Sequence, residues 1–484
     1  MARLRPSDRA EPAVLAVDVG SSSVRAALYD RRGRPWPGGG SHLPYAARTD
    51  AGGAAEVDPE RLLRLIARAL TEALWQAPGP LGAVGLSAFW HSLVGVDGAG
   101  APTTPVLLWS DTRAWRQAER LRRELDVEAV RRRTGVPIHP SYWPAKLAWL
   151  REARPAAWRR TSHWLSFPDL LYLRLFGKVG TSPSMASGTG LRRLAGGWDP
   201  ELLQLLAVDA GTLPGEVPEM SGLRPLQGRR WPQLREVPWL TARGDGALAN
   251  LGSGSADPTR RAITLGTSGA LRVVTDRLPP SLAPGLWCYL LDAGRYVVGG
   301  SLSDGGNLWA WLERTLRLEG PGLERRLRRL RPGSGPDFLP LLAGERSPGF
   351  APHAAGAVAG LTQATTAEQI ARSAMEGVAV RFAMVDVALD QSVPGGATLV
   401  ASGGALHASR LWAQLVADAV GKPLSVSPDF EASTVGAALL ALRRLGVRVE
   451  AHPRRGRLVA PSPEAHQAYA SVRARQERLY RLLV

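Results

Sequence analysis

The chain has 484 residues, more than one ordinary hydrophobic core supports, so two domains are expected. Its 45% hydrophobic and 21% charged residues are typical of a globular protein, and no apolar run approaches the roughly 18 residues that indicate a membrane span. The single cysteine, Cys288, excludes an internal disulfide and a zinc site built from several cysteines. The basic N-terminus leads into no apolar signal segment, which favours a cytoplasmic location.

The formal net charge of +17 raises the question of a nucleic acid or a membrane surface as partner. Arginine carries nearly all of this charge, because lysine occurs only at positions 146, 178 and 422, and the arginines are spread over the whole chain. The densest clusters lack the interleaved aromatic residues on which single-stranded nucleic acid stacks. We therefore interpret the charge as a basic surface, and expect neither nucleic acid nor membrane as a partner.

The first predicted element is a strand, a tight turn and a second strand, in "AVLAVDVGSSSVRAALYD", residues 13–30. Asp18 lies directly before the turn. It either supplies a carboxylate to Mg²⁺, which prefers such oxygen ligands, or only fixes the turn through its own side chain. A helix is predicted next, with Asp58 as N-cap and Pro59 at its first position.

Residues 262–276, "AITLGTSGALRVVTD", repeat this pattern. Gly266 follows Gly20 by 246 residues, about half the chain, which predicts two domains of one kind that face each other. Two such turns could hold a phosphate chain through backbone N–H groups and hydroxyls. Only the first copy adds a carboxylate, because Thr264 occupies the place of Asp18.

Two further helices are predicted in the C-terminal half. Residues 365–389 indicate a helix with an apolar core stripe, opened by a capping box from Thr365 to Glu368. Residues 400–426 indicate a strand end, a Gly-Gly turn and a helix with Ser409 as N-cap. The Gly-Gly turn would let a flat ring such as adenine approach the backbone, although a plain strand-to-helix turn explains it equally well. No P-loop and no GxGxxG after a strand is present, so a nucleotide needs another architecture.

These elements, in this order and spacing, resemble the FGGY family of carbohydrate kinases over nearly the whole chain. The segment "DVGSSSVRAALYD" is similar to the family's first phosphate motif, "TLGTSGALRVV" to its second, and "GGALHASRLWAQLVADAVGKPL" to its adenosine-side signature. The segments "GLSAFWHSLVGVD", "LLWSDTRAW", "ARGDGALANLGSG" and "LAGERSPGF" resemble other family segments. Within the family, "WSDTRA", "RTGVPIHPSYWPAKLAWL" and "SPSMASGTGL" are most similar to gluconokinases.

The resemblance implies an α/β fold of two actin/hexokinase-like (ribonuclease H-like) domains around an interdomain cleft. We expect the N-terminal domain over residues 10–254, the C-terminal domain over 260–446 and an extension over 447–484. The sugar would bind on the N-terminal side and ATP on the C-terminal side, and closure would exclude water. ATP and Mg²⁺ are the implied cofactors, and a homodimer is the candidate assembly.

The implied reaction is transfer of the γ-phosphoryl group of ATP to D-gluconate, giving 6-phosphogluconate. Another polyol or a xylulose-type ketose as acceptor is the near alternative, and an actin-fold ATPase without a sugar acceptor is the distant one. The implied nucleotide-side residues are Asp18, Gly20, Ser21, Ser22, Ser23, Arg25, Gly266, Thr267, Ser268, Asn307, Gly403, Gly404, Ala405 and Ser409. The implied substrate-side residues are Trp90, His91, Asp111, Arg113, Lys146 and Asp245, and the implied metal ligands are Asp18 and Asp245.

Each key residue also has a purely structural interpretation. The local sequence around Asp245 favours an N-cap, and it is the resemblance that implies a general base instead; Asn307 would likewise look the same as an ordinary N-cap. His91 either binds a sugar hydroxyl or is a buried core histidine. Arg113 and Lys146 are candidate cations for a sugar-acid carboxylate, or ordinary surface charges.

Two departures from the family pattern concern the shape of the sugar site. Phe89 and Trp90 stand where smaller or thinner side chains are usual, and Gly246 stands where several members carry an amide. Both affect the choice of substrate rather than the reaction.

Overall fold

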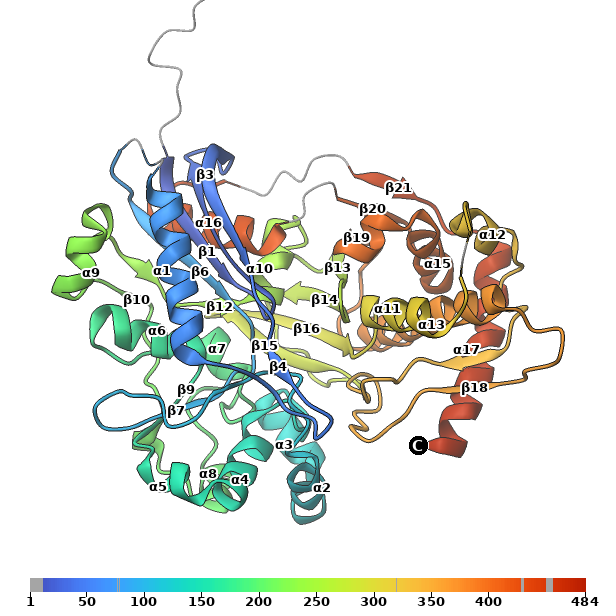
Figure 1. The fold of residues 1–484 in the computed structure, drawn as a ribbon, viewed down its shortest axis with the longest axis horizontal. Helices are drawn as coiled ribbons and strands as arrows, with labels where there is room; N and C mark the ends of the chain where they lie inside the picture. The colour runs from blue at the N-terminus through green and yellow to red at the C-terminus, as the bar shows by residue number, and fades with distance from the viewer. Residues whose placement is uncertain (1–11, 76, 78, 319, 428–430, 450–455) are drawn as a thin grey trace, which may run out of the picture. The chain divides into compact units, whose positions relative to one another are not determined.

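The computed structural model describes residues 12–75, 77, 79–318, 320–427, 431–449 and 456–484 (Figure 1). Packing contacts divide the chain into two compact units. Unit 1 comprises Met1–Gly254, Tyr289–Arg295 and Glu431–His452, and unit 2 comprises Ser255–Cys288, Tyr296–Phe430 and Pro453–Val484. The domain bounds expected from the sequence were continuous, whereas unit 1 also includes Tyr289–Arg295 and Glu431–His452, and most of the expected extension falls in unit 2.

Unit 1 is built on a seven-stranded sheet in the order β10-β11-β6-β1-β2-β3, with β12 also paired to β6. β2 lies antiparallel to both β1 and β3, whereas β6 is parallel to β1, β11 and β12. The strands are β1 (Pro12–Val19), β2 (Ser23–Asp30), β3 (Pro35–Pro44), β6 (Ala83–Ala88), β10 (Glu219–Met220), β11 (Trp239–Leu240) and β12 (Arg243–Gly244). The expected strand–turn–strand opening is therefore confirmed.

Helices cover this sheet. α1 (Pro59–Trp75) packs on β2 and β3, and α16 (Ala432–Arg444) packs on β1 and β6; in Figure 1 the first lies in front of the strands and the second behind them. Because both faces are covered, residues 13–17 and Val19 of β1 are apolar and buried, and Asp18 is the buried charged residue among them. Gly85 lets α16 approach closely, since a Cβ there would lie 2.1 Å from the carbonyl oxygen of Ala437.

The rest of unit 1 is mainly helical, with two small sheets. These are β4 (Arg48–Thr49) with β5 (Ala55–Val57) and β8 (Val106–Leu107), and β7 (Val94–Val96) with β9 (His163–Leu165). The helices are α2 (Trp115–Glu124), α3 (Val127–Thr134), α4 (Trp143–Ala153), α5 (Pro155–Arg160), α6 (Phe167–Phe176), α7 (Pro183–Ser187), α8 (Pro200–Leu206), α9 (Pro225–Arg230) and α10 (Asp245–Gly252), with 3₁₀ turns at Ala210–Thr212 and Pro232–Leu234.

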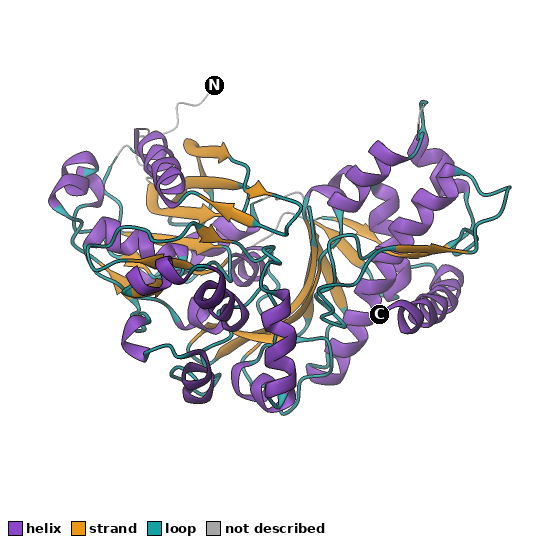
Figure 2. Cartoon of the chain, turned by 60° about the horizontal axis from the view of Figure 1, so that its bottom comes forward, coloured by secondary structure: helices purple, strands orange, loops and turns teal. Residues whose placement is uncertain are grey.

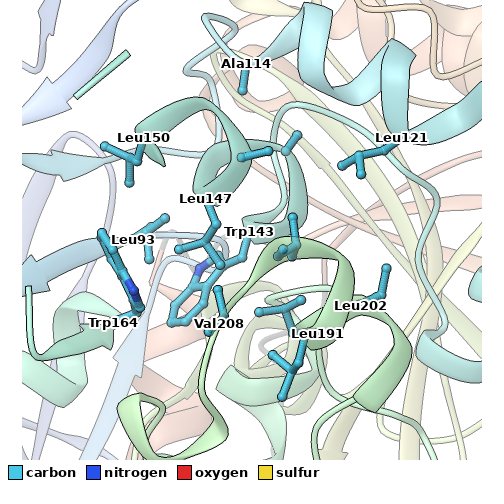
Figure 3. Packing of buried hydrophobic residues seen from close by; sticks show 14 of the residues in the cluster. Leu93, Ala114, Leu121, Trp143, Leu147, Leu150, Trp164, Leu191, Leu202 and Val208 are labelled. Carbon is cyan, nitrogen blue, oxygen red and sulfur yellow. The ribbon is translucent and has the colours of Figure 1, made fainter. Parts of the chain in front are cut away.

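Helix α4 is held by a hydrophobic cluster (Figure 3). Trp143, Leu147 and Leu150 recur at helical spacing and are 0–2% exposed, and they pack with Leu93 and Leu191. Burying such side chains stabilises the helix by about 1.5–3 kcal/mol each. Helix α4 is therefore held in place by packing, and with it the polar side chains that it carries.

Unit 2 repeats the sheet of unit 1. Its strand order is β15-β16-β14-β13-β19-β20-β21, with β13 antiparallel to β14 and parallel to β19, in the same sense as β1 with β2 and β6. The strands are β13 (Arg260–Leu265), β14 (Gly269–Thr275), β15 (Trp287–Asp292), β16 (Arg295–Leu302), β19 (Thr398–Ser402), β20 (Leu424–Val426) and β21 (Arg457–Val459), with β17 (Asp337–Leu339) and β18 (Ala357–Ala359) as a separate pair. Residues Tyr289–Arg295, which include most of β15, are grouped with unit 1. The expected internal repeat is confirmed.

The helices of unit 2 are α11 (Gly306–Thr315), α12 (Leu323–Arg329), α13 (Ala367–Ser392), α14 (Gly404–Ala408), α15 (Arg410–Val420) and α17 (Pro463–Leu483). Together with unit 1 this gives the mixed α/β composition seen in Figure 2. The long helix α13 opens one residue later than predicted: its capping box joins Thr366 and Gln369, not Thr365 and Glu368.

The arginine-rich C-terminal segment forms α17, which packs on α13, α15 and β17. The Tyr469 hydroxyl donates to Glu376 at 3.1 Å, and Gln476 donates to the carbonyl oxygens of Phe338 and Gly377. The extension is thus an integral part of unit 2. Among the described residues, no helix is long and apolar enough to cross a membrane.

Candidate active site

Asp18 lies in unit 1 near the end of β1, opposite Arg25 of β2. It is 2% exposed, and its Oδ2 accepts hydrogen bonds from Arg25 at 3.2 Å and from Ser433 at 2.9 Å. Its Oδ1 is buried without a hydrogen-bond partner in the described part of the chain. A buried carboxylate oxygen without a partner is costly unless another group satisfies it, and a hydrated Mg²⁺ ion would fit that need.

The turn after Asp18 is held by its own backbone. The Gly20 N–H donates to the Ser23 carbonyl at 2.9 Å, and the Tyr45 hydroxyl donates to the Gly20 carbonyl at 2.5 Å. Ser21 and Ser22 lie at the tip with exposed or half-exposed side chains, whereas Ser23 is buried as the first residue of β2. Tyr45 was not predicted; burial, and then the Asp18 carboxylate, raise the pKa of its phenol.

The corresponding turn of unit 2 contacts the start of α11. Gly266 repeats the first turn by donating to the Ser268 carbonyl at 3.0 Å, and the carbonyls of Gly266 and Thr267 accept from the N–H groups of Gly306 and Asn307. The turn at residues 266–268 and the start of α11 are therefore joined by backbone hydrogen bonds.

Asn307 is the second residue of α11 rather than its N-cap, which is Gly305. Its Oδ1 accepts from the Gly305 N–H at 2.7 Å, and its Nδ2 donates to Asp304 at 2.8 Å. Burial raises the pKa of Asp304 to about 6, although hydrogen bonds from Ala343 and Asn307 oppose that shift.

A cavity of about 710 Å³ in unit 2 brings together residues from five stretches of the sequence, near positions 266, 306, 323, 375 and 404. One edge is polar and rich in glycine, and the opposite wall is apolar. Such a volume and lining suit a nucleotide-sized ligand, with backbone N–H groups for phosphates and an apolar slot for a base. The lining residues are Gly266, Thr267, Gly306, Asn307, Trp309, Ala310, Leu323, Glu324, Leu327, Met375, Gly404, Ala405, Ala408, Ser409, Leu411 and Trp412.

The Gly-Gly turn and the N-cap beside this cavity have the expected conformations. Gly403 has φ +98°, and a Cβ there would lie 2.5 Å from the Leu265 carbonyl oxygen, so this position requires glycine. Gly404 opens α14 and faces empty space. Ser409 caps α15 by accepting from the Trp412 N–H at 3.0 Å, which confirms its predicted N-cap role. The apolar wall from α12 was not predicted, because its leucines look like ordinary core residues in the sequence.

The predicted base, Asp245, begins α10 in unit 1 directly after β12. The N-cap of this helix is Gly244, so Asp245 does not act as the N-cap; its Oδ1 accepts from the N–H of Gly246 at 2.7 Å. The parallel pairing of Gly244 with Ala88 brings Asp245 to the end of β6, where Phe89, Trp90 and His91 follow. The sheet register thus places the carboxylate beside the expected sugar-side segment.

Trp90 fills a slot between two glycines. A Cβ at Gly188 would lie 2.4 Å from its ring and one at Gly244 only 1.8 Å, and its indole N–H donates to the Ser184 carbonyl at 3.0 Å. The ring is 6% exposed and lies 4.8 Å from the ring of Tyr289. The Trp90 ring is therefore held in one position, as a fixed wall of the expected sugar site.

His91 has an unusual backbone, with φ 67°. Its Nδ1 lies 2.5 Å from the Gly188 carbonyl, and because a carbonyl only accepts, Nδ1 carries the proton. The imidazole lies edge-on to Tyr142 and Tyr289 at 4.9 and 5.5 Å, and the hydroxyls of these two tyrosines hydrogen-bond to each other at 2.7 Å. Neither tyrosine was predicted from the sequence.

Asp111 and Arg113 form a buried ion cluster with Glu56. The Arg113 Nη2 donates to Asp111 at 2.6 Å and to Glu56 at 2.8 Å, and its guanidinium lies 4.5 Å over the ring of Trp149. The Asp111 carboxylate also accepts from the Ala55 N–H. Two carboxylates already neutralise Arg113, so it is not the surface charge of the structural interpretation.

Lys146 is 1% exposed, and its ammonium donates to the carbonyls of His91 and Leu108, both at 2.8 Å. Burial lowers its pKa to about 7; the Asp111 charge raises the pKa and the Arg113 charge lowers it further. Thus the two predicted cations for a substrate carboxylate both have partners within the protein.

The described residues contain no group of three or more His, Cys, Asp or Glu side chains that could hold a metal ion. Magnesium bound to phosphates does not need one, because it takes one or two carboxylates, water and phosphate oxygens. Asp18 and Asp245 both belong to unit 1. Of the two, Asp18 has the buried oxygen that an ion would satisfy.

Comparison with known proteins gives the family. The N-terminal domain pattern of the FGGY family of carbohydrate kinases matches residues 13–252, and its C-terminal domain pattern matches residues 261–445. A gluconokinase from Bacillus subtilis (strain 168) is 29% identical over 451 residues, covering 90% of this chain and 88% of the relative. A xylulose kinase from Streptomyces coelicolor is 31% identical over 438 residues, covering 89% and 87%.

The fold agrees with this result. The crystal structure of gluconate kinase from Lactobacillus acidophilus superposes with a TM-score of 0.89 at 25% identity, covering 97% of this chain and 98% of that one. The chain therefore belongs to the FGGY family and is a carbohydrate kinase with the two-domain actin/hexokinase-like fold.

Proposed function

We propose that this kinase transfers the γ-phosphoryl group of ATP to a hydroxyl of D-gluconate, giving 6-phosphogluconate. The observation that carries the proposal is the position of Asp245, which opens α10 at the end of β6 beside Trp90 and His91. A carboxylate there can take the proton of an acceptor hydroxyl, which is the one proton-transfer role that phosphoryl transfer requires.

The nucleotide would lie in the cavity of unit 2, with its phosphates against the glycine-rich edge and its base against the apolar wall. Because the transition state of phosphoryl transfer is loose, donors that position and neutralise the phosphates matter more than covalent chemistry. In unit 2 we propose the Thr267 hydroxyl as such a donor, because the N–H groups of Gly266, Gly306 and Asn307 already donate to backbone carbonyls. Mg²⁺, when bound, neutralises charge on the phosphates, and Asp18 and Asp245 are our proposed ligands for its water shell.

Gluconate is the favoured acceptor because two gluconokinases are 29% and 27% identical over 90% of this chain, and because the segments around Asp111 and Tyr142 resemble those of gluconokinases. Xylulose kinases are comparably similar, so a ketose or another polyol is the alternative acceptor. We propose a cytoplasmic location and keep the homodimer as a prediction.

The test is Mg²⁺-dependent ADP release from ATP with D-gluconate, D-xylulose, glycerol and other polyols. We expect turnover with gluconate, lost by about 10²- to 10⁴-fold in Asp245→Asn, the usual effect of removing a general base. Asp276→Asn, at an exposed position, is the matched control and should match the wild type. Turnover with xylulose alone would identify xylulose, rather than gluconate, as the acceptor. An active Asp245→Asn variant would refute the role of Asp245.

A further inference from the structure

Lys146 is a buried cation whose hydrogen bonds go to the backbone. It is one of three lysines in the chain, is 1% exposed, and donates to the carbonyls of His91 and Leu108 at 2.8 Å each. A buried carbonyl needs a donor, and an ammonium gives stronger hydrogen bonds than a neutral group. The sequence suggested a carboxylate-binding cation, but the geometry gives Lys146 a different target.

That target is a residue in an unfavourable conformation. His91 has φ 67°, in the left-handed region that a non-glycine residue enters only when its surroundings hold it there. Two side chains of α4 hold consecutive carbonyls of this segment: Lys146 binds that of His91, and Trp143, three residues earlier on the same helix face, binds that of Ser92 at 2.8 Å.

We call the two hydrogen bonds from Lys146 and Trp143 to this backbone the clamp. The Leu108 carbonyl, which is the second acceptor of Lys146, connects the clamp to another segment of the candidate site. The Leu108 carbonyl also accepts from the Asp111 N–H at 3.2 Å, so Lys146 joins the loop that carries His91 to the loop that carries Asp111. The charged groups that act on the Lys146 ammonium are Asp111, which favours it, and Arg113, which opposes it. The helix that carries this clamp is itself fixed by the hydrophobic cluster around Trp143.

We propose that Lys146 is a positioning residue, whose ammonium holds the left-handed backbone of His91 and thereby aims the imidazole at the acceptor site. The imidazole is fixed at its other end by the Gly188 carbonyl, so the direction of the ring depends on both anchors. Lys146 acts through His91 and does not itself bind the acceptor. This inference rests on the proposed function of the His91 segment.

The first test is a double-mutant cycle between Lys146→Met and His91→Ala, measured as kcat/KM with gluconate. We expect Lys146→Met to raise the KM for the acceptor at least about 10-fold and to leave the KM for ATP unchanged. The reason is that a displacement of a positioning group by about 1 Å can lower the rate about 10²-fold. The double variant should be no worse than His91→Ala alone. Lys146→Arg should recover part of the loss, and Lys178→Met, at an exposed lysine of the same unit, should match the wild type.

Additive losses in the double variant would overturn the proposal, because they would mean that Lys146 and His91 act independently on the acceptor. An unchanged KM in Lys146→Met would also overturn it. Should Lys146→Met fail to fold by circular dichroism, Lys146→Gln, which keeps one amide donor group, replaces it in the same cycle.

A second measurement does not depend on turnover. In ¹⁵N-histidine-labelled protein, the imidazole signal that is missing from His91→Ala should move in Lys146→Met and stay in place in Lys178→Met. If the wild type phosphorylates no acceptor, the proposed function fails, but this signal still decides the role of Lys146. An unmoved signal would refute the clamp even in an active kinase.

Discussion

The indole of Trp90 lies directly against the backbone of Gly244, the residue before Asp245, so closely that a Cβ at position 244 would be 1.8 Å from the Cε2 atom of the ring. Gly188 lies similarly close to another part of the ring, since a Cβ there would be 2.4 Å from its Cδ1 atom. The absence of two side chains thus sets the distance between the Trp90 wall and the start of α10.

We predict that Gly244→Ala displaces either the Trp90 ring or the start of α10, and with it Asp245. Overpacking of this kind typically costs about 1–3 kcal/mol of unfolding free energy, and kcat should fall more than the KM for ATP rises. Urea unfolding and steady-state kinetics measure the two effects. Adding Trp90→Leu should restore stability in the Gly244→Ala background; a double variant as unstable as the single one would contradict the packing argument.

The neighbouring glycines of unit 2 give a matched pair for the nucleotide cavity. Gly404→Ala adds a methyl group to open space at the start of α14, so the free energy of unfolding should stay within about 0.5 kcal/mol of the wild type, as for most substitutions without a clash. Because Gly404 lines the cavity, the KM for ATP should rise several-fold while the KM for the acceptor does not.

Gly403→Ala is the contrasting variant, since it forces φ +98° on alanine and brings its Cβ 2.5 Å from the Leu265 carbonyl oxygen. It should lower the thermal unfolding temperature clearly. Equal effects of both variants on stability would contradict the backbone argument for Gly403. No effect of Gly404→Ala on the KM for ATP would speak against a nucleotide at this edge of the cavity.

The buried, unpartnered oxygen of Asp18 predicts a change in magnesium dependence. Asp18→Asn removes the negative charge, so the Mg²⁺ concentration for half-maximal rate should rise, and kcat at saturating Mg²⁺ should fall by roughly 10²-fold, as when one electrostatic contact to the transition state is lost. Ser433→Ala removes only one donor to the other oxygen and should change neither value more than a few-fold. A normal magnesium dependence in Asp18→Asn would leave Asp18 with only the turn-fixing role.

The sequence predicted those parts of the fold and the candidate site that depend on local order. The strand pair around Asp18, the start of α1 at Pro59 and the Ser409 cap each follow from residues within one or two turns of each other. The capping box of α13 was placed one residue early because Thr365 and Thr366 both stand three residues before a suitable partner, and sequence spacing alone does not separate them.

Contacts over long sequence distances were not predictable in this way. Tyr142 and Tyr289 lie 147 positions apart, yet their hydroxyls meet beside His91. Likewise, Arg113 and Lys146 could be recognised as cations, but their partners depend on how loops from different parts of unit 1 fold together. Charge was visible in the sequence, whereas the group that neutralises or binds it was not.

The lowered pKa of Lys146, about 7 in the folded protein against an ordinary value of 10.5, predicts a pH-dependent contribution to stability. Between these two values the unfolded chain binds a proton that the folded protein does not, so the free energy of unfolding rises with pH over this window. Below pH 7 both states hold the proton, and Lys146 gives no slope. The full cost of burying the ammonium is therefore present at low pH and is relieved as the folded state loses its proton.

Lys146→Met removes this titration, so the wild type should gain stability relative to that variant as the pH rises from 7 to 9. Urea unfolding midpoints at pH 6, 7.5 and 9 measure the difference, and Lys178→Met should run parallel to the wild type throughout. Asp111 and Arg113 are present in both proteins, so the comparison isolates the change at position 146. A difference between wild type and Lys146→Met that is constant with pH would mean that the ammonium keeps an ordinary pKa, and that its two carbonyl partners together with Asp111 offset the full cost of burial.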